Sequence, residues 1–429
     1  MATPARRIAY RVLRDVDAGG STLADRLAQA DAQGLPARDR ALLHELVLGT
    51  LRQRGALDFA LRPLLERQPL ERLDAPVRTI LRLGAHQILH LRVPDRAAVS
   101  ESVDLARAVA PRAAGLVNAV LRRLAREGPP TPPDPATDPL GWLGTAGSLP
   151  PWLAERWVGR LGAGRAVARA RAWLAAPPAA FRLNPRVPDA LEQARKAGLA
   201  PAPLPVPGAF AATAGNPQEL AARGVLYLQD EGSQMVGHLA AGGRLTLDAC
   251  AAPGGKSLLL ADANAADAIV VAAEASPRRV KTLAEIVRRW GAPGIRVVAA
   301  DGVRPPLAAG FDAVLIDAPC SGLGTLARHP DIRWRAKAGD LPHHAGRQGA
   351  LLRSLAPLVR PGGALVFATC SPEPEENEGV VEPFLASHPE FAPAPGPGWA
   401  SHFADGPFYR TLPERDGGDA FFAARLRRA

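Results

Sequence analysis

The stretch TLDACAAPGGKS, residues 246–257, decides the fold class of this chain. It begins as a short apolar β run and then breaks into a turn that contains two consecutive glycines, Gly254 and Gly255. A glycine pair between a strand and a helix lets the backbone approach a ligand closely. The spacing is neither GxGxxG nor GxxxxGK[ST], so it matches neither the dinucleotide loop nor the P-loop. The stretch therefore predicts a strand–turn–helix unit with a ligand-binding turn of another kind.

Apolar β runs alternate with helical stretches on the C-terminal side of this turn. Helical periodicity marks residues 276–291 and 344–363, and the β runs occupy residues 246–250, 268–275, 295–301, 312–319 and 364–370. Alternation of this kind predicts a parallel sheet in a doubly wound α/β fold. The run FFAARLRR, residues 421–428, is expected to form a late edge strand.

The rest of the chain differs in pattern from this α/β part. Apolar residues recur at helical spacing through residues 5–128, and prolines then crowd the stretch PPTPPDPATDP. We therefore expect four parts, namely an all-helical domain at 1–128, a linker at 129–139, a small mixed α/β adaptor at 140–221 and a Rossmann-like catalytic domain at 222–429.

Composition narrows the class of protein. The chain has 429 residues and three cysteines, whose wide spacing fits neither a disulfide framework nor a zinc knuckle. Its nine histidines show no metal-ligand spacing, so no metal is expected. There is no apolar run of about 18 residues, the length that a transmembrane helix needs. We expect a cytoplasmic monomer that does not enter a membrane.

Net charge favours a polyanionic partner. The chain carries a formal charge of +10, and residues 1–128 hold 21 arginines against 14 acidic residues, a difference of +7. Nucleic acid is the simplest partner for a basic protein of this size. The alternative is a composition bias, because lysine occurs only four times and arginine replaces it elsewhere.

Reactive and acidic side chains gather where the predicted strands end. Each of Cys250, Cys320 and Cys370 closes an apolar run, and Glu274 and Asp301 end two other strands. The carboxyl ends of parallel strands face one crevice, where α/β proteins bind their ligands. A free cysteine is usually a small buried apolar residue, but two in adjacent strand-end turns fit that role poorly. A thiol nucleophile needs such a turn and a way to become a thiolate.

Four segments together carry a family resemblance: DACAAPGGK (248–256), DAPCSG (317–322), RHPDIRW (328–334) and ATCSPEPEEN (368–377). They resemble the RNA (cytosine-5)-methyltransferases that use S-adenosyl-L-methionine, and most of all the RsmB-type enzymes of small-subunit ribosomal RNA. Residues 1–128 are similar to the NusB-like RNA-binding domain of those enzymes. The implied fold is an all-α NusB-like domain followed by an α/β Rossmann-like methyltransferase domain.

The resemblance also implies roles for individual residues. Cys370 is expected to be the nucleophile that attacks C6 of cytosine, Cys320 to assist product release, and Asp317 to hold the cytosine edge. The positions that would bind S-adenosylmethionine are Cys250, Ala251, Ala252, Pro253, Gly254, Gly255, Lys256, Glu274, Asp301 and Asp317. RNA contacts are expected from Arg182, Asn184, Arg328, His329, Arg333 and Trp334.

Other readings stay open at this stage. The same fold and cofactor could serve tRNA or large-subunit ribosomal RNA, or the chain could be a non-catalytic RNA-binding factor. An intact Cys320/Cys370 pair argues against a decayed site, and Cys370 argues against a DNA cytosine methyltransferase. Two positions depart from the family pattern: Glu274, where Asp is commoner, and Ala420, where Gly is usual.

Overall fold

The computed structural model describes residues 2–19, 22–66 and 68–429, which divide into two compact units. Unit 1 comprises Met1–Ala176 together with Leu326–Arg335, and unit 2 comprises Pro177–Thr325 together with Ala336–Ala429. The segment 140–221, expected to be one adaptor, is divided between the two units, because the first stretch of unit 1 ends at Ala176 and unit 2 begins at Pro177. The segment Leu326–Arg335 was expected within the catalytic domain but packs into unit 1.

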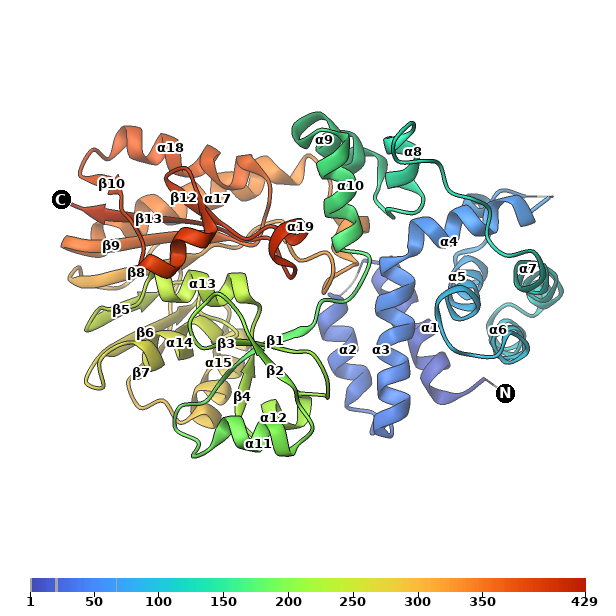
Figure 1. Cartoon of the computed structure of the whole chain (residues 1–429), viewed down its shortest axis with the longest axis horizontal. Helices are drawn as coiled ribbons and strands as arrows, with labels where there is room; N and C mark the ends of the chain where they lie inside the picture. The colour runs from blue at the N-terminus through green and yellow to red at the C-terminus, as the bar shows by residue number, and fades with distance from the viewer. Residues whose placement is uncertain (1, 20–21, 67) are drawn as a thin grey trace. The chain divides into compact units, whose positions relative to one another are not determined.

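Unit 1 is helical in its described residues, as the periodicity predicts (Figure 1). A buried core that includes Leu46, Leu83 and Leu121 joins the first seven helices. Pro4 begins the first helix at a position where its missing N–H costs nothing, and the Thr22 side chain caps the second by accepting from the Asp25 N–H. The helices are α1 (Pro4–Asp17), α2 (Leu23–Asp31), α3 (Ala37–Arg52), α4 (Arg54–Leu61), α5 (Ala75–His90), α6 (Asp95–Val109), α7 (Ala114–Glu127), α8 (Pro139–Gly144), α9 (Pro151–Leu161), α10 (Ala163–Ala172) and the short α16 (Ile332–Arg335).

Unit 2 is built on a mixed sheet with the strand order β11-β12-β13-β9-β8-β5-β6-β7, and β10 pairs with β13. The five central strands β5 to β9 run parallel, which confirms the predicted doubly wound arrangement. The run at 421–428 forms β13, but it is not an edge strand, because β9 and β12 pair with its two sides. The strands are β5 (Leu245–Asp248), β6 (Ile269–Glu274), β7 (Ile295–Ala299), β8 (Phe311–Asp317), β9 (Val359–Thr369), β10 (Phe391–Pro393), β11 (Ala404–Asp405), β12 (Phe408–Arg410) and β13 (Phe422–Arg428).

Helices cover both faces of this sheet (Figure 1). Alternate residues of a strand point to opposite faces, so Leu315 of β8 joins one buried cluster while Val314 and Ile316 join another. The first cluster takes side chains from α13 (Glu231–Leu239), α14 (Gly255–Ala263) and α15 (Pro277–Trp290), and the second from α17 (Asp340–Leu355) and α18 (Glu378–Ser387). A smaller antiparallel sheet comes before the large sheet in the sequence. Its strand order is β2 (Pro201–Pro203), β3 (Ala209–Ala212), β1 (Ala179–Leu183) and β4 (Leu226–Leu228), and the helices α11 (Ala190–Lys196) and α12 (Gln218–Ala222) lie between these strands in the sequence.

None of the described helices is long and apolar enough to cross a membrane.

Candidate functional site

The turn after β5 requires its glycines. Gly254 has φ +126°, a region that glycine occupies without strain, and an added Cβ there would lie 2.9 Å from Leu283 Cδ1. An added Cβ on Gly255 would lie 2.8 Å from Tyr227 Cε1. Helix α14 begins at Gly255, so the turn leads into a helix N-terminus, as the sequence predicts. Side chains pack on this turn from α15 and β4, which holds its backbone in place.

Two buried groups sit at the start of this turn. Asp248 is fully buried at the end of β5, where its Oδ2 accepts a hydrogen bond of 2.6 Å from Ser257 Oγ. Burial raises the pKa of Asp248 to about 6, against the opposing effects of the Ser257 hydrogen bond and the Lys256 charge. Burial and the nearby carboxylates also raise the pKa of the Cys250 thiol, so this cysteine stays neutral. Cys250 therefore lacks the thiolate that a nucleophile needs, whereas Asp248 is a feature of the turn that sequence reasoning left without a role.

Lys256 and Asp317 form an ion pair between α14 and the end of β8. The Lys256 Nζ lies 2.7 Å from Asp317 Oδ2, and the Lys256 side chain is 10% exposed against 29% for Asp317. Burial acts to lower the pKa of Lys256, but the charge and hydrogen bond of Asp317, with Asp248 nearby, outweigh it and raise the pKa. The lysine therefore remains a cation, and Asp317 keeps one side open to a ligand.

The next two strands place carboxylates at the same edge of the sheet. Glu274 ends β6, where its Oε1 accepts from the Ser276 N–H at 2.9 Å and its Oε2 lies 3.3 Å from Arg279 Nη1. Arg279 also donates to the Ala252 carbonyl at 2.6 Å, which ties Glu274 to the glycine turn. Asp301 follows β7 and is exposed, with the Val303 N–H bonded to its Oδ1.

These residues fit S-adenosylmethionine by their chemistry. The cofactor carries a sulfonium and an ammonium cation together with ribose hydroxyls. Carboxylates at successive strand ends accept hydrogen bonds from hydroxyls and attract cations, and the close glycine backbone leaves room beside them. Of the predicted cofactor residues, the glycine turn, Glu274 and Asp301 thus come to one edge of the sheet.

Cys320 and Cys370 lie in contact. Their Sγ atoms are 3.1 Å apart, as free thiols in the turns that follow β8 and β9. The hydrogen bond with Cys370, followed by burial and the charge of Glu376, raises the pKa of Cys320 well above its ordinary value. Cys320 therefore keeps its proton and can donate it in the hydrogen bond to the Cys370 sulfur.

A buried carboxylate ties the two cysteine turns together. Glu376 is fully buried and accepts hydrogen bonds from the Ser321 N–H at 2.7 Å and the Ser321 hydroxyl at 2.6 Å, each from the residue after Cys320. It also accepts from the hydroxyl of Ser371, the residue after Cys370, and from the Gln348 amide at 3.2 Å. Glu376 lies in the motif ATCSPEPEEN, but no role for it was predicted from the sequence. The only indication in the sequence was that this acidic residue follows Cys370 closely along the chain.

Gly324 brings the same two turns together through the backbone. Its N–H donates to the Cys370 carbonyl at 2.9 Å, and its own carbonyl accepts from the Ala420 N–H at 2.8 Å. An added Cβ on Gly324 would lie 2.1 Å from the Ala420 oxygen and 2.6 Å from the Cys370 oxygen. Only glycine fits there. Ala420, one of the departures from the family pattern, enters this contact by its main chain, so its methyl group leaves the contact intact.

Two residues expected to contact RNA are instead structural. Arg182 is buried on β1, where it pairs with Asp262 at 2.5 Å and donates to the Gly255 carbonyl at 3.2 Å. Asn184 is also buried, and its amide donates to the Gly224 and Trp290 carbonyls. Side chains committed in this way are not available to a ligand, so their predicted role is wrong. Arg182 instead stabilises the glycine turn through its hydrogen bond to the Gly255 carbonyl.

The motif RHPDIRW is partly structural as well. Arg333 is fully buried in unit 1, where its guanidinium donates to four carbonyls, those of Arg52, Ser148, Trp173 and Leu326, at 3.1–3.3 Å. Burial lowers its pKa to about 9. Trp334 donates its indole N–H to the Leu51 carbonyl at 2.8 Å. The predicted RNA contact is therefore wrong for Arg333, and the Trp334 indole N–H is already used. Exposed His329 and half-buried Arg328 stay predictions.

Among the described residues, no group of three or more histidine, cysteine, aspartate or glutamate side chains is arranged to hold a metal ion.

Comparison with known proteins adds two family matches. The model of the 16S rRNA methyltransferase RsmB/F family matches residues 240–427, and that of the NusB family matches residues 3–126. The ribosomal RNA small subunit methyltransferase B of Thermus thermophilus is 38% identical, over 99% of this chain and 97% of that protein. The protein of the same name from Pseudomonas putida is 35% identical, over 90% of this chain and 89% of its own length.

Solved structures agree on the fold. The crystal structure of PH0851 aligns over 99% of both chains with a TM-score of 0.79 at 24% identity. A methyltransferase homologue from Pyrococcus horikoshii aligns over 68% of this chain and 99% of its own, with a TM-score of 0.57 at 25% identity.

Proposed function

Because the chain belongs to the 16S rRNA methyltransferase RsmB/F family and so uses S-adenosylmethionine, we propose that it methylates C5 of a cytosine in small-subunit ribosomal RNA through a covalent cysteine adduct. The observation that carries this proposal is the 3.1 Å contact between the Cys320 and Cys370 sulfurs. A single nucleophilic thiol would not need a second thiol against it. A covalent intermediate that must be both formed and released gives each sulfur a task.

Cys370 is the nucleophile in this scheme. Cytosine C5 is a poor nucleophile, but addition of the Cys370 thiolate to C6 makes an S–C6 bond and moves an electron pair toward C5. S-adenosylmethionine, when bound, would supply an electrophilic methyl group to C5, and its sulfur would keep the electron pair of the broken S–CH3 bond. Afterwards a base removes the C5 proton, the C5–C6 double bond re-forms and the S–C6 bond breaks, returning the electron pair to Cys370. The target cytosine must be unstacked from the RNA to reach the sulfur.

Cys320 and Asp317 assist this cycle. Cys320 holds a proton against the Cys370 sulfur, and its hydrogen bond can stabilise the electron pair that returns to that sulfur on release. The open side of Asp317 can accept from the cytosine amino edge, while the ion pair with Lys256 holds the carboxylate in place. These roles use residues at the ends of β8 and β9, beside the carboxylates that suit the cofactor.

The test is trapping of the adduct. Cys320→Ala should accumulate an SDS-stable band of protein bound to small-subunit ribosomal RNA, and Cys370→Ala should abolish methyl transfer. The matched control is the double variant, in which the band should disappear. A band that persists without Cys370, or turnover by Cys370→Ala above about one hundredth of wild type, would overturn the nucleophile assignment. Bisulfite mapping of ribosomal and transfer RNA from a deletion strain then identifies the target cytosine.

A further inference from the structure

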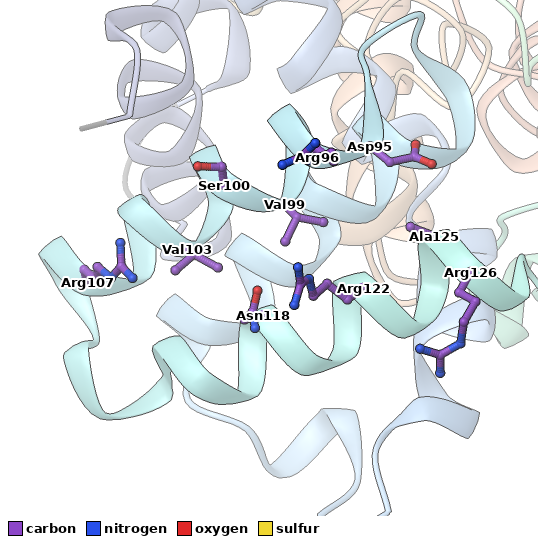
Figure 2. A pocket seen from close by; sticks show the side chains of 10 residues that line it. All are labelled: Asp95, Arg96, Val99, Ser100, Val103, Arg107, Asn118, Arg122, Ala125 and Arg126. Carbon is purple, nitrogen blue, oxygen red and sulfur yellow. The ribbon is translucent and has the colours of Figure 1, made fainter.

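A basic groove lies between helices α6 and α7 of unit 1 (Figure 2). We call it the α6–α7 groove. Its cavity measures about 510 Å³, and Asn118 and Arg122 point into it from α7 toward α6 in Figure 2. The lining residues are Asp95, Arg96, Val99, Ser100, Val103, Arg107, Asn118, Arg122, Ala125 and Arg126.

The groove carries a surplus of positive charge. Four of its ten lining residues are arginines and one is an acid, which leaves a net charge of 4 − 1 = +3. Within the described ranges, neither Arg96 nor Arg122 forms an ion pair. Arg107 and Arg126 pair only with acids of their own helices, Asp104 at 3.1 Å and Glu127 at 2.9 Å, and both arginine side chains are 70% exposed. Exposed pairs of this kind contribute little, so an incoming anion can replace them.

The floor of the groove suits a polymer better than a single ion. Val99 and Val103 are buried beneath it, while Ser100 and Asn118 add neutral donors and acceptors. Arg96 and Arg107 lie eleven residues apart on α6, which corresponds to about 16 Å at 1.5 Å per residue. One strand of a nucleic acid helix places a phosphate roughly every 3.4 Å, so this length matches four or five phosphates.

We propose that the α6–α7 groove binds the sugar–phosphate backbone of the substrate RNA, apart from the methyl-transfer site. The proposal rests on the proposed function in one respect, that RNA is the substrate. Guanidinium groups bind phosphate oxygens with paired hydrogen bonds, and the serine and asparagine can bind ribose hydroxyls. Contacts of this type hold and orient RNA without reading its sequence.

The test removes the two arginines that lack ion pairs. The double variant Arg96→Gln/Arg122→Gln should bind a small-subunit ribosomal RNA fragment about tenfold more weakly at 0.1 M salt, measured by fluorescence anisotropy without cofactor. The slope of log K against log salt should become shallower by about 1.4, or about 0.7 for each lost contact with single-stranded RNA. The matched control is Arg38→Gln/Arg40→Gln, which removes the same charge from exposed positions of α3.

Three outcomes decide the matter. Equal weakening in the groove variant and the control would reduce the effect to general charge and overturn the proposal. Displacement of the RNA by poly-glutamate at the same charge concentration would point to an acidic protein partner and also overturn it. Weakening confined to the groove variant supports the proposal, even if no 5-methylcytosine is found. The adduct experiment on Cys370 tests the proposed chemistry separately, because the binding assay requires no methyl transfer.

Discussion

Replacing Glu376 by glutamine should slow methyl transfer while leaving the cofactor site untouched. The carboxylate accepts four hydrogen bonds from both cysteine turns and from Gln348. A glutamine has the same shape, but one of its two terminal atoms becomes a donor and the charge is lost. Hydrogen bonds to charged groups are worth about 1 kcal/mol more than neutral ones, which sets an upper bound of about 4 kcal/mol for four bonds.

Part of that loss is recovered, because the hydroxyls of Ser321 and Ser371 can rotate to accept from the new amide. We therefore expect a loss of about 2 kcal/mol. If the lost energy is used to hold the Cys320 and Cys370 turns in contact, kcat/KM falls about 30-fold, since 1.36 kcal/mol corresponds to a factor of ten.

The assay is single-turnover methyl incorporation from labelled S-adenosylmethionine, with cofactor affinity measured by calorimetry. The matched control is Glu382→Gln on α18, which removes an exposed carboxylate of the same kind. Cofactor affinity should be unchanged in both variants. If Glu376→Gln and Glu382→Gln match wild type in both kcat/KM and thermal unfolding, the carboxylate does not position the cysteines and the reasoning is refuted.

Two further predictions concern stability. Burial raises the pKa of Asp248 to about 6, above the ordinary value near 4. The native state therefore binds this proton more tightly than the unfolded chain does. The contribution of Asp248 to stability falls as pH rises from about 4 to 6. Asp248→Asn should flatten that part of a thermal-unfolding curve against pH, and an unchanged slope would count against a buried, proton-binding Asp248. Arg333→Met leaves four carbonyls without their donor and should destabilise unit 1 by about 3–5 kcal/mol, measured by hydrogen exchange. Its control, Arg38→Met at an exposed position of α3, should cost no more than about 1 kcal/mol, and equal losses would contradict the anchoring role.

Local sequence pattern predicted most of the parallel sheet and its strand-end residues. Strand–helix alternation and the glycine turn depend on backbone preferences that act over a few residues. This is why the turn at 249–255, Glu274, Asp301 and the two cysteines could be placed at one edge before any contact was known. Strand pairing was harder to predict, because residues 421–428 have the same β character whether one side or both sides pair.

Only the tertiary structure decided what the cations and the buried acid do. An arginine in a sequence is equally compatible with an RNA contact and with an ordinary surface position. Arg182 and Arg333 instead lie in the interior, where a buried charge requires hydrogen bonds. Asp262 accepts one from Arg182, and backbone carbonyls accept those of Arg333. Cys320 and Cys370 touch although they lie about 50 residues apart in the sequence, and Glu376 links their two turns by hydrogen bonds. No local pattern contains such a distance. The sequence by itself determined which thiols the strands present, and long-range packing decided that they touch.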